Sequence, residues 1–321
     1  MTHGGNQRRI AWLFPGQGAQ HVGMGKDFAS ASPAAAEVFA RADRTLGLPL
    51  ARICFDGTPE ELARTDIQQP AIFATSVAIW AAIQELGGLD GMPGAAAGLS
   101  LGEWTALHVA GALSFEDGLR LVRRRGELMQ SAALATPSGM VSLVGADEAT
   151  ADALCRAAAE GAVLVPANFN CPGQIVISGE RAACERAISL AEEFGCRALP
   201  LKVAGAFHSP LMAPAAEGLA NALAQTHLAV PRLMVPTNVD GEYHVAPERV
   251  RESLRQQLVQ PVRWQKSVER LAADGFDTFV EVGPGRVLTG LLRKINRQLR
   301  VVNVSAVADL DALSTASPAS V

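Results

Sequence analysis

The chain has 321 residues, 49% of them hydrophobic and 19% charged, and its formal net charge is −4. This length allows one large core or a body with an insert, and the acidic balance argues against a general nucleic-acid-binding protein. No apolar run reaches the roughly 18 residues of a membrane-spanning helix. The five cysteines are odd in number and show no Cys-x-x-Cys spacing, so we expect a cytoplasmic protein without a disulfide framework or a zinc site.

The first predicted element is a buried strand at residues 10–14, which ends in the glycine-rich turn PGQGAQ. The turn lacks the third glycine of a dinucleotide-binding Gly-x-Gly-x-x-Gly, because His21 stands at that position. Its backbone N–H groups could instead stabilise a developing oxyanion. A plain tight turn before a helix is compatible with that use.

A long helix is predicted for residues 69–86, and a weak strand then leads into Gly98-Leu99-Ser100-Leu101-Gly102, followed by another helix. Strand-like runs recur later and predict an α/β fold with a mainly parallel sheet. Because ligands gather at the carboxyl ends of such strands, we expect Gln17 and Ser100 at the functional edge. The later strand-like runs are residues 231–239, 276–285 and 299–307.

The middle of the chain has the predicted order strand, helix, strand, strand, helix, strand, which is that of a ferredoxin-like unit. We therefore divide the chain into a body of residues 1–133 and 204–307, an insert of residues 134–203 and a flexible tail of residues 308–321. The predicted insert elements are residues 140–145, 147–160, 162–168, 174–178, 180–195 and 197–203.

Ser100 is a candidate nucleophile, although Gly-x-Ser-x-Gly also arises by chance in a chain with 30 glycines. A serine hydroxyl needs an adjacent base. His208, in a turn rich in glycine, alanine, serine and proline, could present its imidazole to a cleft or serve only the structure. His21 and His108 also stay open as candidates. The remaining histidines stand in the N-terminal leader or in polar, loop-like segments: His3, His227 and His244.

A helix capped by Ser114 is predicted to place Arg125 on its apolar face. An arginine there needs a polar or charged partner, because an unpaired buried charge is very costly. The partner could be an internal carboxylate such as Glu103 or the carboxylate of a substrate, which a guanidinium can bind through two parallel hydrogen bonds. The apolar positions of this helix are Leu121, Val122, Leu128, Met129, Ala132 and Ala133.

Seven motifs between residues 10 and 305 resemble, in the same order, those of malonyl-CoA:acyl-carrier-protein transacylases of fatty-acid and polyketide synthesis. One of them alone would be weak, but seven in family order are highly specific. The resemblance implies an α/β-hydrolase-like body with a ferredoxin-like insert, in agreement with the architecture predicted above. The motifs are FPGQGAQ, QQPAI, GLSLGEWTALHVAGALSFEDGLRLVRRRGELMQ, NFNCPGQIVISG, GAFHSPLM, QLVQPVRW and EVGPGRVLTG.

By matching motif, the resemblance implies that Ser100 accepts the acyl group and that His208 is its general base. A main-chain carbonyl orients this histidine in the family, and the matching residue is Gln257. The backbone N–H groups of Gln17 and Leu101 would form the oxyanion hole. The implied substrate-binding residues are Arg125 for the malonyl carboxylate, with Gln69, Asn168 and Phe207 in the same pocket.

The implied reaction moves a malonyl group from malonyl-CoA to the phosphopantetheine thiol of acyl carrier protein through a malonyl-serine ester. A thioester and an ester are close in energy, so we expect no metal or redox cofactor, and we expect a monomer. Leu99 and Trp104 replace the histidine and tyrosine usual in the family, and Gly205 replaces a histidine common in multidomain synthases. The bulk of Phe207 leaves little room for the α-methyl group of methylmalonyl units.

Three other functions compete with this interpretation. A hydrolase of acyl carrier proteins would use the same serine and histidine but would gain nothing from a buried carboxylate receptor at Arg125. The second alternative is a transacylase for another acyl group. The third is a scaffold protein that keeps the fold but has no catalytic activity. Retention of Ser100, Arg125 and His208 together argues against the scaffold.

A basic segment near the C-terminus could receive the typically acidic carrier protein. A solvated helix face is an equally good explanation of these charges. The residues are Arg286, Arg293, Lys294, Arg297 and Arg300.

Overall fold

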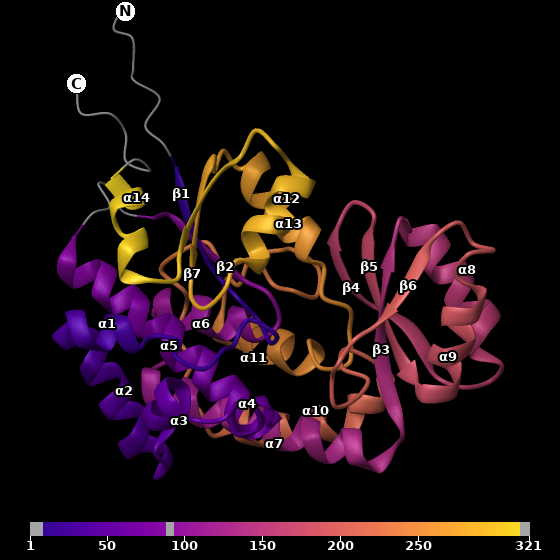
Figure 1. Cartoon of the computed structure of the whole chain (residues 1–321), viewed down its shortest axis with the longest axis horizontal. Helices are drawn as coiled ribbons and strands as arrows, with labels where there is room; N and C mark the ends of the chain where they lie inside the picture. The colour runs from indigo at the N-terminus through magenta and orange to yellow at the C-terminus, as the bar shows by residue number, and fades with distance from the viewer. Residues whose placement is uncertain (1–8, 88–92, 315–321) are drawn as a thin grey trace, which may run out of the picture.

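The computed structural model describes residues 9–87 and 93–314, and within these ranges it contains two sheets of four strands each (Figure 1). In the first sheet all neighbouring strands are parallel, in the order β2-β1-β7-β8, which confirms the predicted α/β fold. Its strands are β1 (Ile10–Phe14), β2 (Ala95–Gly98), β7 (Thr278–Val282) and β8 (Arg300–Val304).

Helices cover both faces of the parallel sheet, so alternate residues of one strand enter different cores. In β1, Trp12 and Phe14 pack into the larger core, and Ala11 and Leu13 pack into the smaller one. The helices of the larger core include α1 (Lys26–Ala31), α2 (Pro33–Leu46), α3 (Leu50–Asp56), α4 (Pro59–Ala63), α5 (Thr65–Leu86), α6 (Leu101–Val109), α7 (Phe115–Ala135), α10 (Ala213–Ala224) and α11 (Pro247–Gln256). Those of the smaller core are α12 (Trp264–Ala273) and α13 (Val287–Ile295).

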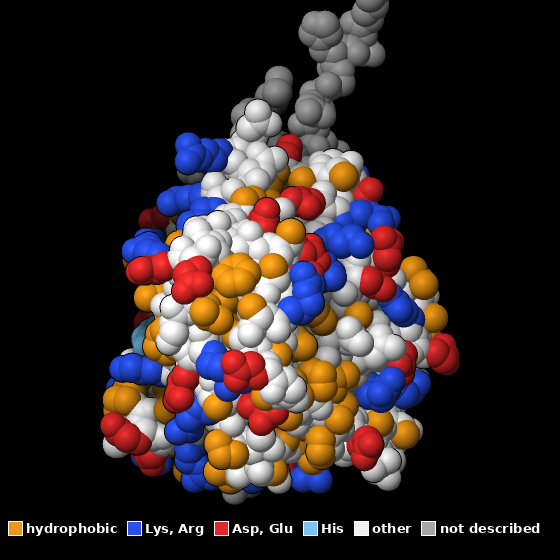
Figure 2. All heavy atoms as spheres, turned by 90° about the vertical axis from the view of Figure 1, so that its right-hand side faces the viewer, with side chains coloured by type: hydrophobic (Ala, Val, Ile, Leu, Met, Phe, Trp, Pro, Cys, Tyr) orange, Lys and Arg blue, Asp and Glu red, His pale blue; other side chains and the backbone are white. Residues whose placement is uncertain are grey.

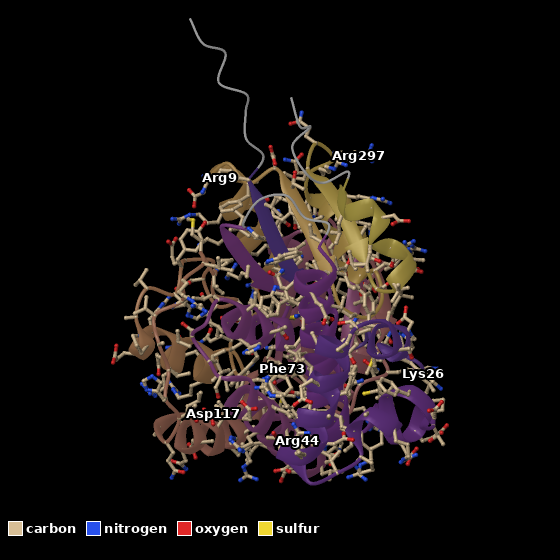
Figure 3. The ribbon with its side chains drawn as sticks, turned by 90° about the vertical axis from the view of Figure 1, so that its left-hand side faces the viewer. Arg9, Lys26, Arg44, Phe73, Asp117 and Arg297 are labelled. Atoms are coloured by element: carbon tan, nitrogen blue, oxygen red, sulfur yellow. The ribbon has the colours of Figure 1, made fainter. Side chains whose placement is uncertain are left out.

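The layer of helices over the larger core faces the viewer in Figure 3. Phe73 of α5 lies among the helices in this view and is fully buried. Lys26, Arg44 and Asp117 lie toward the margins.

The second sheet is antiparallel, has the order β4-β5-β3-β6, and forms a separate lobe on the right of Figure 1. Val141 and Leu143 pack on one face against α8 and α9, whereas Met140 and Val176 on the other face join the larger core. Positive and negative side chains are interspersed over this lobe in Figure 2. Its elements are β3 (Ser138–Val144), α8 (Glu148–Ala159), β4 (Leu164–Cys171), β5 (Gln174–Glu180), α9 (Arg181–Leu190) and β6 (Arg197–Pro200), in the predicted order of types.

The strand predicted at residues 231–239 is wrong. Only isolated bridges form in this segment, one of them between Met234 and Ala95 of β2. Pro231 and Pro236 flank the bridge, and a proline cannot donate a ladder hydrogen bond, so pairing does not extend in either direction. The segment therefore runs along the edge of the sheet without joining it as a strand.

The flexible tail predicted from residue 308 also differs from the structure. A 3-10 turn at Val307–Asp309 and a helix, α14 (Asp311–Ser314), continue the fold. Leu313 is fully buried, and the Asp309 carboxylate accepts hydrogen bonds from the backbone of Ser305 and Ala306. Val307 and Leu310 also pack against the larger core, and the Val307 N–H donates to the Asp27 carboxylate at 2.7 Å, so this segment belongs to the fold. Residues 315–321 lie outside the described ranges.

The parallel strands end at one edge, where the candidate site residues gather. Gln17 follows β1 and Ser100 follows β2, as predicted from the sequence. Asn168 of β4 reaches the same region because β4 pairs with the segment before α12, where Val262 donates its N–H to the Ala167 carbonyl at 2.8 Å. Among the described helices, none is long and apolar enough to cross a membrane.

Candidate active site

Ser100 occupies a sharp turn between β2 and α6. Its backbone angles, φ 52° and ψ −101°, are unusual for a residue with a side chain and cost about 1–3 kcal/mol, as expected where the surrounding structure imposes them. The turn also brings backbones unusually close. A Cβ atom on Gly102 would lie 2.0 Å from the Phe14 carbonyl oxygen, and one on Gly16 would lie 2.4 Å from that of Leu99. Glycine at these two positions allows the first loop to approach the serine.

The turn brings Ser100 beside His208, which lies 108 residues away in the sequence. The Oγ of Ser100 is 2.8 Å from His208 Nε2, and His208 Nδ1 is 2.6 Å from the main-chain oxygen of Gln257. A carbonyl can only accept, so Nδ1 carries the hydrogen and Nε2 of the neutral ring accepts from the serine hydroxyl. The arrangement is that of a nucleophile, a base and a group that orients the base.

The surroundings keep His208 neutral. Its side chain is buried, and this burial, together with the positive charge of Arg125, lowers the pKa of the imidazole to about 3. The hydrogen bond to the Gln257 carbonyl acts in the opposite direction but is weaker. A proton acceptor is therefore present over the whole neutral pH range.

Arg125 is fully buried, as helix periodicity predicts. Its Nη1 donates to Gln69 Oε1 at 2.8 Å, and its Nη2 donates to Ser100 Oγ and Gln257 Oε1, both at 3.0 Å. These acceptors are uncharged, and Nε has no partner among the described residues. Burial lowers the pKa of the guanidinium to about 10, and Glu103 opposes this shift through space without contacting the arginine. A buried cation beside a nucleophile, with donors to spare, is suited to an anionic substrate group.

A buried polar cluster lies behind these residues, and of its members the sequence singles out Glu103 and Gln257 but not Asn238. Glu103 accepts hydrogen bonds from His244 Nε2 at 2.7 Å, from Gln257 Nε2 at 2.6 Å and from the backbone of Asn238 at 3.1 Å. Asn238 also fixes the serine turn, because its Oδ1 accepts from the Ser100 N–H at 2.6 Å and its amide donates to the Gly98 carbonyl. His244 lies in a loop, as expected from the sequence, but its side chain is buried against Glu103.

A pocket of about 350 Å³ opens onto Ser100 and His208. Gln17, Asn168 and Phe207 line it, and the Gln17 side chain donates to Gln68 at 2.6 Å. Leu101 is the first residue of α6, where backbone N–H groups have no partner within the helix. Gln69 is fully buried and contacts the pocket region through Arg125. The structure therefore brings all of the predicted site residues together.

The other histidines lie away from this pair. His21 and His227 are exposed, and His108 Nδ1 lies 2.9 Å from the Leu113 carbonyl among aromatic rings. Burial lowers the pKa of His108, in keeping with a structural role. His3 lies outside the described residues. Of the three candidates His21, His108 and His208, the one whose ring lies within hydrogen-bond distance of Ser100 Oγ is His208.

Packing accounts for two of the three departures from the expected motifs, Trp104 and Gly205, and nothing in the structure explains Leu99. Leu99 is half-buried and lines the pocket, and Trp104 is fully buried in the larger core. A Cβ atom on Gly205 would lie 2.4 Å from the Cβ of Ala133, so the end of α7 leaves no room for a side chain there.

Comparisons of the sequence and of the structure with known proteins agree on one enzyme family. The profile of the acyl transferase domain family matches residues 11–313. The malonyl CoA-acyl carrier protein transacylase of Bacillus subtilis is 44% identical over 299 residues, which cover 92% of this chain and 93% of that protein. The structure of the corresponding transacylase from Coxiella burnetii has a TM-score of 0.94 at 36% identity and covers 97% of this chain and 98% of that one. A malonyl-transacylase solved in complex with its type II PKS acyl-carrier protein has a TM-score of 0.92 at 42% identity, with 96% and 99% covered.

The close approach at Gly102 gives a prediction about the serine turn. Replacement of Gly102 by alanine should destabilise the protein by about 3 kcal/mol or more, because the new methyl group would overlap the Phe14 carbonyl. Gly290→Ala in α13 is the matched control, since a Cβ there meets nothing within 4 Å and alanine favours a helix by up to about 1 kcal/mol. Denaturant unfolding measures both, and equal stabilities of the two variants would contradict the packing argument.

Proposed function

Since this chain belongs to the acyl transferase domain family, among the malonyl CoA-acyl carrier protein transacylases, we propose that it transfers malonyl groups from malonyl-CoA to the phosphopantetheine thiol of an acyl carrier protein. The observation that carries this proposal is Arg125. Its buried guanidinium donates to Ser100 Oγ, and its direct protein partners are all uncharged. The malonyl carboxylate, which lies two bonds beyond the reacting carbonyl, could reach this guanidinium while the carbonyl stays at Ser100.

In the first half of the reaction, Ser100 Oγ attacks the thioester carbonyl of malonyl-CoA. The hydroxyl proton passes to His208 Nε2, the oxygen–carbon bond forms, and the carbon–sulfur bond breaks. The proton then moves from His208 to the departing coenzyme A sulfur. Gln257 keeps the imidazole in the required tautomer through its main-chain oxygen. We assign the oxyanion hole to the backbone N–H groups of Gln17 and Leu101.

In the second half, the carrier-protein thiol attacks the malonyl-serine ester, and His208 accepts the thiol proton and returns it to Ser100. Ester and thioester exchange without oxidation or reduction, so we propose that no metal or redox cofactor takes part. Gln69 and Asn168 would contact the malonyl group. Phe207, which lines the pocket and is 6% exposed, would disfavour an α-methyl substituent.

The architecture supports a finer description of the fold. We infer an α/β-hydrolase-like body of residues 1–133 and 204–307 and a ferredoxin-like unit of residues 134–203, since its strand order β6-β3-β5-β4 follows a β-α-β-β-α-β chain. The first boundary falls in the last turn of α7, which ends at Ala135. We further propose a monomer that binds no nucleic acid, and five free, buried cysteines support a reducing, cytoplasmic location.

The proposal predicts a covalent malonyl adduct on Ser100. Intact mass spectrometry after mixing with malonyl-CoA should show this adduct, and Ser100→Ala should abolish it. Arg125→Ala should slow loading by about 30- to 5,000-fold, since removing a desolvated partner of a charge pair costs about 2–5 kcal/mol.

Acetyl-CoA and methylmalonyl-CoA serve as comparisons in the same experiment. Faster loading of acetyl that is indifferent to Arg125 would overturn the malonyl assignment. Rapid loss of the adduct in the absence of carrier protein would instead indicate the hydrolase.

The low pKa of His208 predicts an unusual pH profile. The second-order rate constant for malonyl loading should show no acid limb from His208 between about pH 5 and pH 8, because the free imidazole, with a pKa of about 3, is neutral throughout. Arg125→Ala, assayed with acetyl-CoA, should move the acid limb to higher pH, because the charge that lowers the His208 pKa is gone. An acid limb centred near pH 6.5 in the wild-type profile, at the ordinary pKa of histidine, would contradict the low pKa of His208.

The basic segment provides a candidate carrier surface. Val287 and Leu291 of α13 line the pocket, and Arg293, Lys294 and Arg297 near the end of this helix are exposed and form no ion pair with the described residues. The double variant Arg293→Glu/Lys294→Glu should raise the KM for carrier protein and leave malonyl loading unchanged.

A matched control reverses two charges on α7, at Arg120 and Arg124. In Figure 3, Asp117 at the start of that helix lies at the opposite end of the body from Arg297. An unchanged KM in the α13 variant, or an equal rise in both variants, would contradict the docking surface.

A further inference from the structure

A chain of buried hydrogen bonds links the carboxylate of Glu103 to the guanidinium of Arg125 through the side chain of Gln257. Gln257 Nε2 donates to Glu103 at 2.6 Å and to the Ser100 carbonyl at 2.9 Å, and Gln257 Oε1 accepts from Arg125 at 3.0 Å. A carboxylate only accepts and a guanidinium only donates, so the orientation of the amide between them is fixed by chemistry. The two charged ends are therefore joined by one amide whose orientation suits both.

Burial makes the two charges at its ends dependent on each other. Glu103, Gln257 and Arg125 all have no exposed surface, and isolated charges in such a place are very costly. None of the direct acceptors of Arg125 is charged, and among the residues that the structure describes Glu103 is the one carboxylate that stabilises its protonated form through space. Glu103 in turn accepts hydrogen bonds from Asn238 and His244.

We propose that Glu103 is the resident counter-charge of Arg125, a positioning residue that sets how strongly the arginine prefers a carboxylate-bearing acyl group. The inference rests on the proposed function. A carboxylate in direct contact would occupy the guanidinium and block the substrate. Held behind the Gln257 amide, Glu103 balances the charge in the free protein and leaves donors of Arg125 for the substrate.

The same placement moderates the binding of the substrate. Glu103 and the malonyl carboxylate are both negatively charged. Each therefore weakens the attraction between Arg125 and the other carboxylate. A moderate hold is useful in a transferase, because a malonyl-serine bound too tightly would be slow to pass its acyl group on. Removal of the Glu103 charge should therefore raise selectivity for malonyl while it lowers the stability of the free protein.

Glu103→Gln tests this inference because it removes the charge and retains the shape. The new amide can keep its oxygen toward Gln257 and Asn238 and direct its NH₂ group to Nε2 of His244, which can change tautomer since its Nδ1 has no partner among the described residues. Loading of Ser100 is followed by mass spectrometry with malonyl-CoA and with acetyl-CoA. The ratio of the two second-order rate constants should rise about tenfold.

If Glu103 had a purely structural role, Glu103→Gln would lower the rate constants for malonyl and acetyl loading by the same factor. An unchanged ratio of the two rate constants would therefore overturn the inference. If wild type itself does not load malonyl, the proposed function fails. If wild type loads malonyl and the ratio does not move in the variant, only the inference about Glu103 fails.

Glu281→Gln is the matched control. Glu281 is also fully buried, but it accepts from the backbone of Leu288 and Thr289 at the start of α13 and does not contact the Glu103 chain. This variant should lower the melting temperature and leave the malonyl to acetyl ratio as in wild type. An equal rise of the ratio in both variants would also overturn the inference.

A double variant keeps the test valid if Glu103→Gln folds poorly. Glu103→Gln combined with Arg125→Met removes both buried charges, so it should melt at a higher temperature than Glu103→Gln alone, or fold where the single variant does not. Stability losses that simply add in the double variant would show that the two charges are not coupled and would overturn the inference.

Discussion

The buried charge of Arg125 is the constraint around which this site is built. A guanidinium without exposed surface needs acceptors, and here these come from α5, from the serine turn and from Gln257, the residue that follows α11. None of the three segments can move far without leaving a donor unsatisfied. The arginine thus fixes the relative positions of Gln69, Ser100 and Gln257, and Gln257 in turn places His208.

A second constraint is the strained turn that carries Ser100. Its positive φ is tolerable only because Asn238 ties the Ser100 N–H and the Gly98 carbonyl into one unit and Gly102 lets α6 start directly against β1. The same Asn238 is anchored on Glu103, which also holds the Gln257 side chain. Ser100, His208 and Arg125 are therefore all held by one buried polar cluster, so a change in the cluster should alter the position of each of them.

Sequence reasoning succeeded where the signal was local. Helix periodicity alone indicated that Arg125 is buried, and the alternation of strands and helices indicated that Gln17 and Ser100 share the carboxyl edge of a parallel sheet. It failed where hydrogen bonds join segments that lie far apart in the sequence. Glu103 and His244 are 141 residues apart in the sequence, and the residues around neither of them form a pattern that predicts the contact. The role of Gln257 was reached only by resemblance, since every residue has a main-chain carbonyl.

The positions of Arg125 and His208 create a trade-off that the substrate itself can resolve. In the free protein the arginine donates to the serine hydroxyl and lowers the pKa of the histidine, so the base is weak while the site is empty. A carboxylate bound to Arg125 would neutralise part of that charge and strengthen the base next to the carbonyl to be attacked. An acetyl group brings no such charge. Selectivity for malonyl would therefore arise both in binding and in proton transfer, because one buried guanidinium acts on both.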